Sequence, residues 1–277
     1  MATGEHRLEI GSVTWFYREA QPLTPQNRPP VILLHGLVSQ SYSWRNVLPA
    51  LAEQGFRAIA PDWIGCGYSS HPDRRDFAYT PDAFLDAIES LVQKLELQKF
   101  SLVAQGFLGS VGIQYALRHP EQIDRLAIFN APIAQTAKLP WKLKQMGIPL
   151  VGDMMTQDPL LVDRTLEGAG GYRIDDADLD VYRRPWLKTS DVGRALLAMI
   201  QNLQLKSVTA EIETGLKHWE KPLLIGWGVR DRWLPLEMAK TVPQAELVEL
   251  DEVGHYPQED WHEKVSEALI SFLRRQA

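Results

Sequence analysis

The sequence predicts an α/β fold with a mostly parallel, twisted sheet and helices on both faces. Short apolar runs typical of strands alternate along the chain with longer segments whose apolar residues recur at helical spacing. One such run, VILLHG at residues 31–36, is apolar almost throughout, as expected of a strand that is covered on both faces. A long stretch without strands interrupts the alternation in the second half, which indicates an insertion into the sheet.

The elements follow in a regular order. Residues 8–20 alternate and are expected to form an opening antiparallel strand, and a Pro-rich loop follows to residue 30. Further strands are expected at 31–36, 56–62, 100–105, 124–132, 221–228 and within 245–255. Helices are expected at 43–55, 80–97, 107–120 and 259–276. The helix at 80–97 begins with Thr80 as N-cap and Pro81 in its first turn, and the closing helix is acidic first and basic last, as the helix macrodipole favours.

The insertion lies between the strands at 124–132 and 221–228. Residues 133–216 show helical patterns and loops without a strand–helix repeat, and they are too many for a structureless loop. The sequence therefore predicts a core domain made of residues 1–132 and 217–277, with residues 133–216 forming a helical cap, or lid.

Composition excludes several classes of function. The chain has 277 residues, 29 basic against 35 acidic, and a net charge of -6, which gives no electrostatic case for nucleic acid or an anionic membrane. Cys66 is the single cysteine, so no internal disulfide can form, and a reducing compartment such as the cytoplasm is expected. The first residues, MATGEHRLEI, lack the apolar region of a signal peptide, and no apolar run of the sequence is long enough to span a membrane, so a soluble protein is expected. No metal or other cofactor is expected, and the oligomeric state stays open.

Five motifs in order resemble the α/β-hydrolase fold. LLHGLVSQSYSW resembles the segment that supplies the oxyanion hole, and APDWIGCGYSS the turn after the next strand. LVAQGFLGS occupies the place of the nucleophile elbow, GWGVRDRWLP that of the acid turn, and GHYPQEDW that of the histidine loop. The residues of these motifs are similar to those of the haloalkane dehalogenase and epoxide hydrolase branch of this fold. DDADLDVYRRPWLK together with QGFLGS further resembles a group of hydrolase-like proteins from cyanobacteria and chloroplasts.

The resemblance implies a set of site residues. His255 would be the general base, and Asp231 would accept a hydrogen bond from it and fix its tautomer. The backbone N–H groups of Leu37 and Phe107 would form the oxyanion hole. A small apolar or anionic ligand would meet aromatic side chains from the cap, for which the candidates are Tyr182, Trp186 and Trp141.

The nucleophile position departs from the pattern. Aligned with G-x-Nu-x-G, the sequence AQGFL places Gly106 where a serine or aspartate would attack, so no ester can form there. Glycine also relieves the backbone strain of such a turn. Ser110 and Cys66 are weaker candidates to replace the nucleophile. A working haloalkane dehalogenase is not expected, because Gly106, Phe107 and Leu37 hold the places of its aspartate and of its two halide donors.

Three functions stay open. The chain could be an atypical hydrolase in which His255 activates a water without a covalent intermediate. It could be a lyase in which His255 takes a proton from the substrate. It could also be a non-catalytic protein that binds a small ligand or a partner in a capped pocket.

Overall fold

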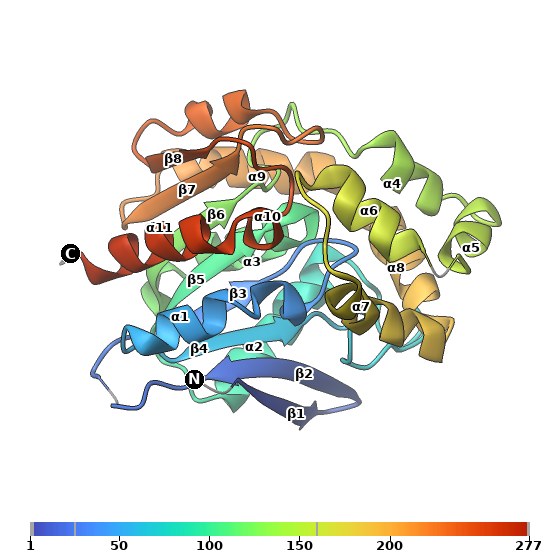
Figure 1. Cartoon of the computed structure of the whole chain (residues 1–277), viewed down its shortest axis with the longest axis horizontal. Helices are drawn as coiled ribbons and strands as arrows, with labels where there is room; N and C mark the ends of the chain where they lie inside the picture. The colour runs from blue at the N-terminus through green and yellow to red at the C-terminus, as the bar shows by residue number, and fades with distance from the viewer. Residues whose placement is uncertain (1–2, 25, 159, 276–277) are drawn as a thin grey trace.

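The computed structural model describes residues 3–24, 26–158 and 160–275. One eight-stranded sheet runs through the molecule in the order β1-β2-β4-β3-β5-β6-β7-β8 (Figure 1). β1 pairs antiparallel with β2 and β2 antiparallel with β4, and every later pairing is parallel. The strands are β1 Gly4–Ile10, β2 Val13–Ala20, β3 Val31–Leu34, β4 Ala58–Asp62, β5 Phe100–Gln105, β6 Ile123–Phe129, β7 Leu223–Gly228 and β8 Glu246–Leu250.

Helices cover both faces of this sheet, as the sequence predicts. In Figure 1, α1 and α11 lie in front of the sheet, while α2, α3 and α9 lie behind it. The helices are α1 Val47–Glu53, α2 Pro81–Lys94, α3 Gly106–Arg118, α4 Trp141–Met146, α5 Val151–Thr156, α6 Leu161–Ala169, α7 Asp176–Lys188, α8 Asp191–Gln201, α9 Leu205–Lys217, α10 Pro257–Asp260 and α11 His262–Arg274. None of the helices in this part of the chain is long and apolar enough to cross a membrane.

The apolar run of β3 is explained by the two cores that it separates. Val31 and Leu33 belong to the core under α1 and α11, whereas Ile32 and Leu34 belong to the core under α2, α3 and α9. Successive side chains of a strand point to opposite faces, so a strand between two apolar layers needs an apolar residue at every position.

The opening segment differs from the expected single strand. Residues 8–20 do not form one strand, because the chain turns at Gly11, whose φ is +58°, and returns as a β1–β2 hairpin. Glycine adopts this left-handed backbone at no steric cost. The alternation of the segment is real, but it spans two strands on either side of a tight turn.

The helices between β6 and β7 divide into two groups. Figure 1 shows α4 to α8 gathered beyond one end of the sheet. α9, which the sequence analysis placed in the cap, packs against α3, and its residues Val208, Ile212 and Leu216 belong to the core behind the sheet. We therefore assign α9 to the core and propose a cap made of α4 to α8.

Candidate active site

The turn from β5 into α3 is built around Gly106. This residue has φ +72°, a backbone angle that residues with a Cβ rarely adopt. A Cβ added to it would stand 2.9 Å from the Cα of Gly36. Both the backbone angle and the close approach of the β3 loop therefore favour glycine. The turn has the sharp geometry of a nucleophile elbow but presents bare backbone at its tip.

His255 lies directly over this bare position. A Cβ on Gly106 would stand 3.4 Å from the Nε2 atom of His255. His255 lies in the loop after β8, and hydrogen bonds to its backbone hold it in place. Its N–H donates to the carbonyl of Ala169 at 2.8 Å, and its carbonyl accepts from Nε2 of Gln105 at 2.7 Å. Its side chain is 1% exposed. The last residue of β5 thus fixes the histidine above the first residue of α3.

Asp231 orients the imidazole from the other side. Its Oδ2 lies 2.8 Å from Nδ1 of His255, and its Oδ1 accepts from the backbone N–H groups of Trp233 at 2.7 Å and Leu234 at 3.1 Å. A carboxylate at this place favours the tautomer with the proton on Nδ1, which leaves the lone pair of Nε2 directed toward Gly106. The structure therefore brings together the histidine and aspartate that the sequence predicted as a pair.

Asn130 is a member of this site that sequence reasoning missed. Its Nδ2 donates to Oδ2 of Asp231 at 2.8 Å, and its Oδ1 accepts from the N–H of Gly228 at 2.8 Å. It follows β6 directly and has φ +40°, a conformation that asparagine tolerates better than most residues. An asparagine immediately after a buried strand was the available signal.

The two expected oxyanion donors lie on loops that meet at the elbow. Leu37 follows Gly36, and Phe107 is the second residue of α3, where backbone N–H groups have no partner within the helix. Among the described residues, no acceptor takes the N–H of Leu37. Its carbonyl accepts from the hydroxyl of Tyr256 at 2.9 Å, which fixes the loop. These donors can stabilise negative charge that develops above Gly106.

Aromatic rings close the site from solvent. The ring of Trp233 lies 4.5 Å from that of His255, and the rings of Phe107 and Tyr256 lie 5.7 and 5.0 Å from it. Next to the Leu37 loop there is a cavity of about 20 Å³, whose lining contains neither His255 nor Gly106. Its lining includes Val38, Tyr182 and Trp186. That space can hold about one water molecule, so a larger ligand needs the cap to move.

The cap aromatics named from sequence occupy different places. Tyr182 and Trp186 of α7 line the small cavity, whereas Trp141 is 69% exposed at the start of α4 and does not line it. Trp141 lies on the outer surface, and its contact with a ligand stays a prediction.

Tyr182 takes part in a polar cluster between cap and core. Its hydroxyl donates to Oε1 of Glu259, which also accepts from Nη1 of Arg45 at 2.8 Å. Nη2 of Arg45 donates to Asp178 of α7 at 2.7 Å. Burial raises the pKa of Glu259, while Arg45 beside it opposes that rise. This cluster fastens α7 to the core, and it leaves the Tyr182 hydroxyl engaged rather than directed at a substrate.

Neither alternative nucleophile is available. Ser110 is buried in α3 and its hydroxyl donates to the carbonyl of Phe107 at 2.6 Å. Burial, with the Asp62 charge adding to it, raises the pKa of the Cys66 thiol far above its ordinary value, so the thiolate is suppressed. In the described part of the chain, no group of three or more His, Cys, Asp or Glu side chains could hold a metal ion.

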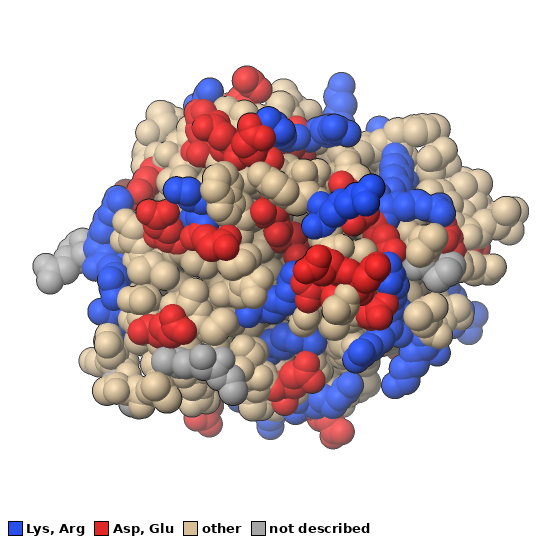
Figure 2. Space-filling view, viewed as in Figure 1, with Lys and Arg blue, Asp and Glu red and all other residues tan. Residues whose placement is uncertain are grey.

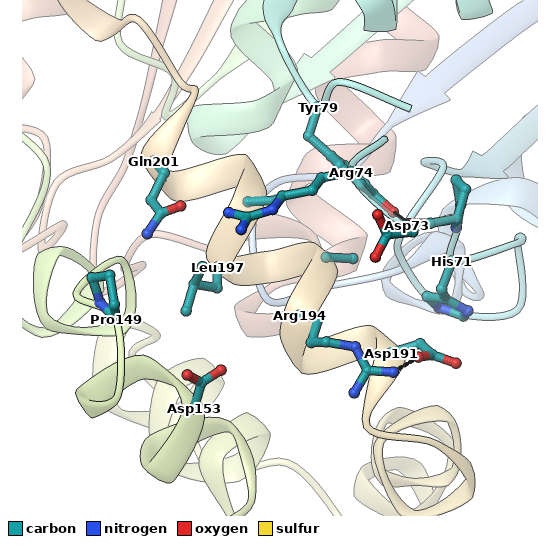
Figure 3. A pocket seen from close by; sticks show the side chains of 13 residues that line it. His71, Asp73, Arg74, Tyr79, Pro149, Asp153, Asp191, Arg194, Leu197 and Gln201 are labelled. Atoms are coloured by element: carbon teal, nitrogen blue, oxygen red, sulfur yellow. Dashed lines mark hydrogen bonds and ion pairs between the residues drawn. The ribbon is translucent and has the colours of Figure 1, made fainter. Parts of the chain in front are cut away.

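A larger hollow of about 620 Å³ lies apart from the histidine, between the loop after β4 and α8 (Figure 3). Figure 3 shows Arg74 and Tyr79 on the loop side and Leu197 and Gln201 on α8. Its lining contains neither His255 nor Gly106. Size alone therefore does not identify the candidate active site, which rests on the dyad and the elbow.

Comparison with known proteins identifies the family and the fold. The model of the α/β hydrolase fold family matches residues 29–173, just over half of the chain, and the protein belongs to that family. Within it, the chain has relatives among the haloalkane dehalogenases, which confirms the resemblance to that branch.

Two relatives and one solved structure illustrate the similarity. The cis-3-alkyl-4-alkyloxetan-2-one decarboxylase of Shewanella oneidensis is 28% identical over 270 residues, covering 88% of this chain and 81% of its own. A haloalkane dehalogenase of Mesorhizobium japonicum is 28% identical over 269 residues, covering 88% and 84%. The crystal structure of haloalkane dehalogenase DbeA from Bradyrhizobium elkani superposes with a TM-score of 0.85 at 24% identity, covering 98% of each chain. The structural match supports the fold and leaves the reaction to be argued from the site.

Proposed function

We propose that this protein is an atypical α/β hydrolase that acts through His255 without a covalent intermediate. The direction of the His255 Nε2 atom, over a turn that carries no nucleophile, is the observation that carries the proposal. Asp231 sets the tautomer that makes Nε2 a proton acceptor. A histidine so placed is a general base for whatever stands above Gly106.

The proposed step uses water in place of the missing side chain. His255 takes one proton from a water, whose oxygen attacks an electrophilic carbon of the bound substrate. The negative charge passes to the substrate oxygen, which faces the N–H groups of Leu37 and Phe107. His255 then gives the proton to the leaving group. Such a site, without its nucleophile, is expected to accelerate the reaction on the order of 10³–10⁴-fold over the uncatalysed reaction in water.

The lining of the small cavity and the names of the relatives support a proposal for the substrate class. The cavity beside the Leu37 loop is bounded by apolar side chains of the cap, such as Val162, Val192 and Leu196. A small, largely apolar ester or ring ester would suit it once the cap shifts. One similar protein is named for the oxetan-2-one that it decarboxylates. Strained ring esters are therefore included among the substrates to be tested.

A specific observation favours a second candidate, a non-catalytic binding protein. His255 and Asp231 are 1% and 0% exposed, and Trp233 packs over the imidazole. A buried histidine–aspartate pair of this kind can serve as a structural hydrogen bond.

The lyase, in which His255 takes a proton from the substrate itself, uses the same base and differs only in the bond that breaks.

One panel separates these functions. The wild-type protein, His255→Ala and Asp231→Asn are incubated with short-chain nitrophenyl esters, epoxides and cis-dialkyl oxetan-2-ones. The proposal expects hydrolysis by the wild type that falls to background in His255→Ala. An α,β-unsaturated acid, formed when His255 takes the proton beside the carbonyl and the ring C–O bond breaks, would indicate the lyase, whereas hydrolysis gives the hydroxy acid. Equal background in all three folded proteins, together with ligand-induced thermal stabilisation, would support the binding protein.

A further inference from the structure

Exposed apolar side chains are concentrated at one end of the cap. Five of the ten large apolar side chains exposed among the described residues lie between residues 141 and 154. They are Trp141, Ile148, Leu150, Val151 and Met154, and we call them the cap tip. α4 and α5, which carry or flank them, pack against each other at the far end of the molecule from the chain termini (Figure 1). A soluble surface rarely gathers apolar side chains in this way without a partner.

The backbone of the tip presents one of these side chains under strain. Leu150 is 77% exposed, and it has φ +67° and ψ -46°. This conformation is close to that of the rare and strained γ-turn, and its side chain makes no compensating burial. Met154, one turn into α5, is 75% exposed. Local strain that leaves a leucine in water is more typical of a binding surface than of a folding requirement.

The charge around the tip is opposite to that of the chain. Residues 138–155 contain three lysines, Lys138, Lys142 and Lys144, against one acidic residue, Asp153, which gives a local charge of +2 in a chain of -6. Lys138 and Lys144 are exposed. Figure 2 shows an end of the molecule that is largely neutral, with basic side chains beside it. The tip is therefore both apolar and locally basic.

We propose that the cap tip docks on the surface of a lipid bilayer that contains anionic headgroups. Tryptophan and leucine beside lysines are the combination by which peripheral proteins enter the interface, with the apolar groups among the upper acyl chains and the lysines at the phosphates. α4 and α5 lie at one extreme of the molecule (Figure 1), where a flat lipid surface can reach them. Pro149 and Asp153 of the same segment also line the hollow of about 620 Å³, so docking would bring that hollow to the lipid surface.

The test is flotation of the full-length protein with vesicles. Vesicles of phosphatidylcholine mixed with phosphatidylglycerol are compared with vesicles of phosphatidylcholine alone, at low and high salt. The proposal expects binding to the mixed vesicles that weakens with salt. Leu150→Ser with Met154→Ser should reduce the partition coefficient by on the order of tenfold or more, and Lys144→Glu by roughly fivefold or more.

Matched controls lie elsewhere on the surface. Leu23, in the loop after β2, is 86% exposed, and Lys206 at the start of α9 is exposed. Leu23→Ser and Lys206→Glu should bind vesicles like the wild type. The proposal is overturned if the wild type does not float with anionic vesicles, or if the control variants lose as much binding as the tip variants. It is also overturned if the tip variants only convert a dimer into a monomer, which would show that a second copy of this chain covers the tip.

Discussion

The Nε2 atom of His255 lies 3.4 Å from the point where a Cβ of residue 106 would stand, and Gly106 provides no such atom. The base and its orienting acid are in place, and the group that they would activate is missing. Under the proposed function, the protein keeps the proton-transfer half of a hydrolase site. What the histidine acts upon must come from solvent or from the ligand.

Gly106→Ala should destabilise the protein by about 1–3 kcal/mol, since alanine would have to adopt φ +72°. The added Cβ would also stand 2.9 Å from the Cα of Gly36, a backbone atom that cannot simply rotate away. Urea unfolding measures the loss. Gly168→Ala is the matched control, because nothing lies within 4 Å of its added Cβ in α6. It should leave stability unchanged or raise it by up to ~1 kcal/mol, and equal losses in both variants would refute the strained turn.

Asp231→Asn should lower any His255-dependent rate by on the order of 10⁴, because the imidazole then loses the partner that sets its tautomer. Steady-state kinetics measure this rate. If Asp231→Asn keeps the full rate, the aspartate does not orient the base.

Asn130→Ala tests the residue that holds Asp231 in place. It removes a hydrogen bond of 2.8 Å to Asp231 and leaves the N–H of Gly228 unpaired, and about 1–3 kcal/mol of stability should be lost.

Arg45→Met should cost about 3–5 kcal/mol, because it leaves the Glu259 carboxylate buried without its cation. Chemical unfolding checks the loss, with Arg230→Met as control. The pair of Arg230 with Glu252 is exposed on both sides, so its loss should cost no more than about 1 kcal/mol.

The loss of unfolding free energy in Arg45→Met should depend on pH in a defined direction. Burial already raises the pKa of Glu259 in the folded protein, and loss of Arg45 raises that pKa further. The folded state then holds a proton that the unfolded state releases, so stability falls as pH rises from the unfolded pKa through the folded one. The deficit should be larger at neutral pH than in mild acid. A deficit that grows on acidification would show that Glu259 is not the group left unpaired.

The Cys66 thiol should resist alkylation in the native protein. Burial raises its pKa, so little thiolate exists at mildly alkaline pH, and the side chain is also covered. Iodoacetamide labelling followed by mass spectrometry should be slow under native conditions and fast in denaturant. Rapid native labelling would make Cys66 an accessible thiol and reopen it as a nucleophile.

Much of the fold could be predicted from the sequence because its signals are local. The fully apolar run at 31–34 marks a strand between two cores, and Thr80 does cap α2, accepting from the N–H of Ala83 at 3.3 Å. The hairpin at Gly11 was missed, because alternation continues on both sides of a two-residue turn. The place of α9 was missed too, because an amphipathic helix carries no sign of which core it covers.

The site divides in the same way. That Gly106, Asp231 and His255 lie together could be predicted, because each lies in an ordered motif that follows a strand. Asn130 was missed although it directly follows a buried strand, because no motif ties it to Asp231, and the contact of Trp233 with His255 depends on how two loops pack. The local charge of the cap tip was hidden as well, because a net charge of -6 averages over the whole surface.

Intact-protein mass spectrometry on quenched turnover mixtures tests the central claim most directly. With a substrate that the wild type hydrolyses and His255→Ala does not, the reaction is stopped at times before, during and after the first turnover. We expect product to accumulate while the mass of the protein stays that of the free chain. A transient increase by the mass of an acyl or alkyl group, mapped to any side chain near Gly106, would contradict the account.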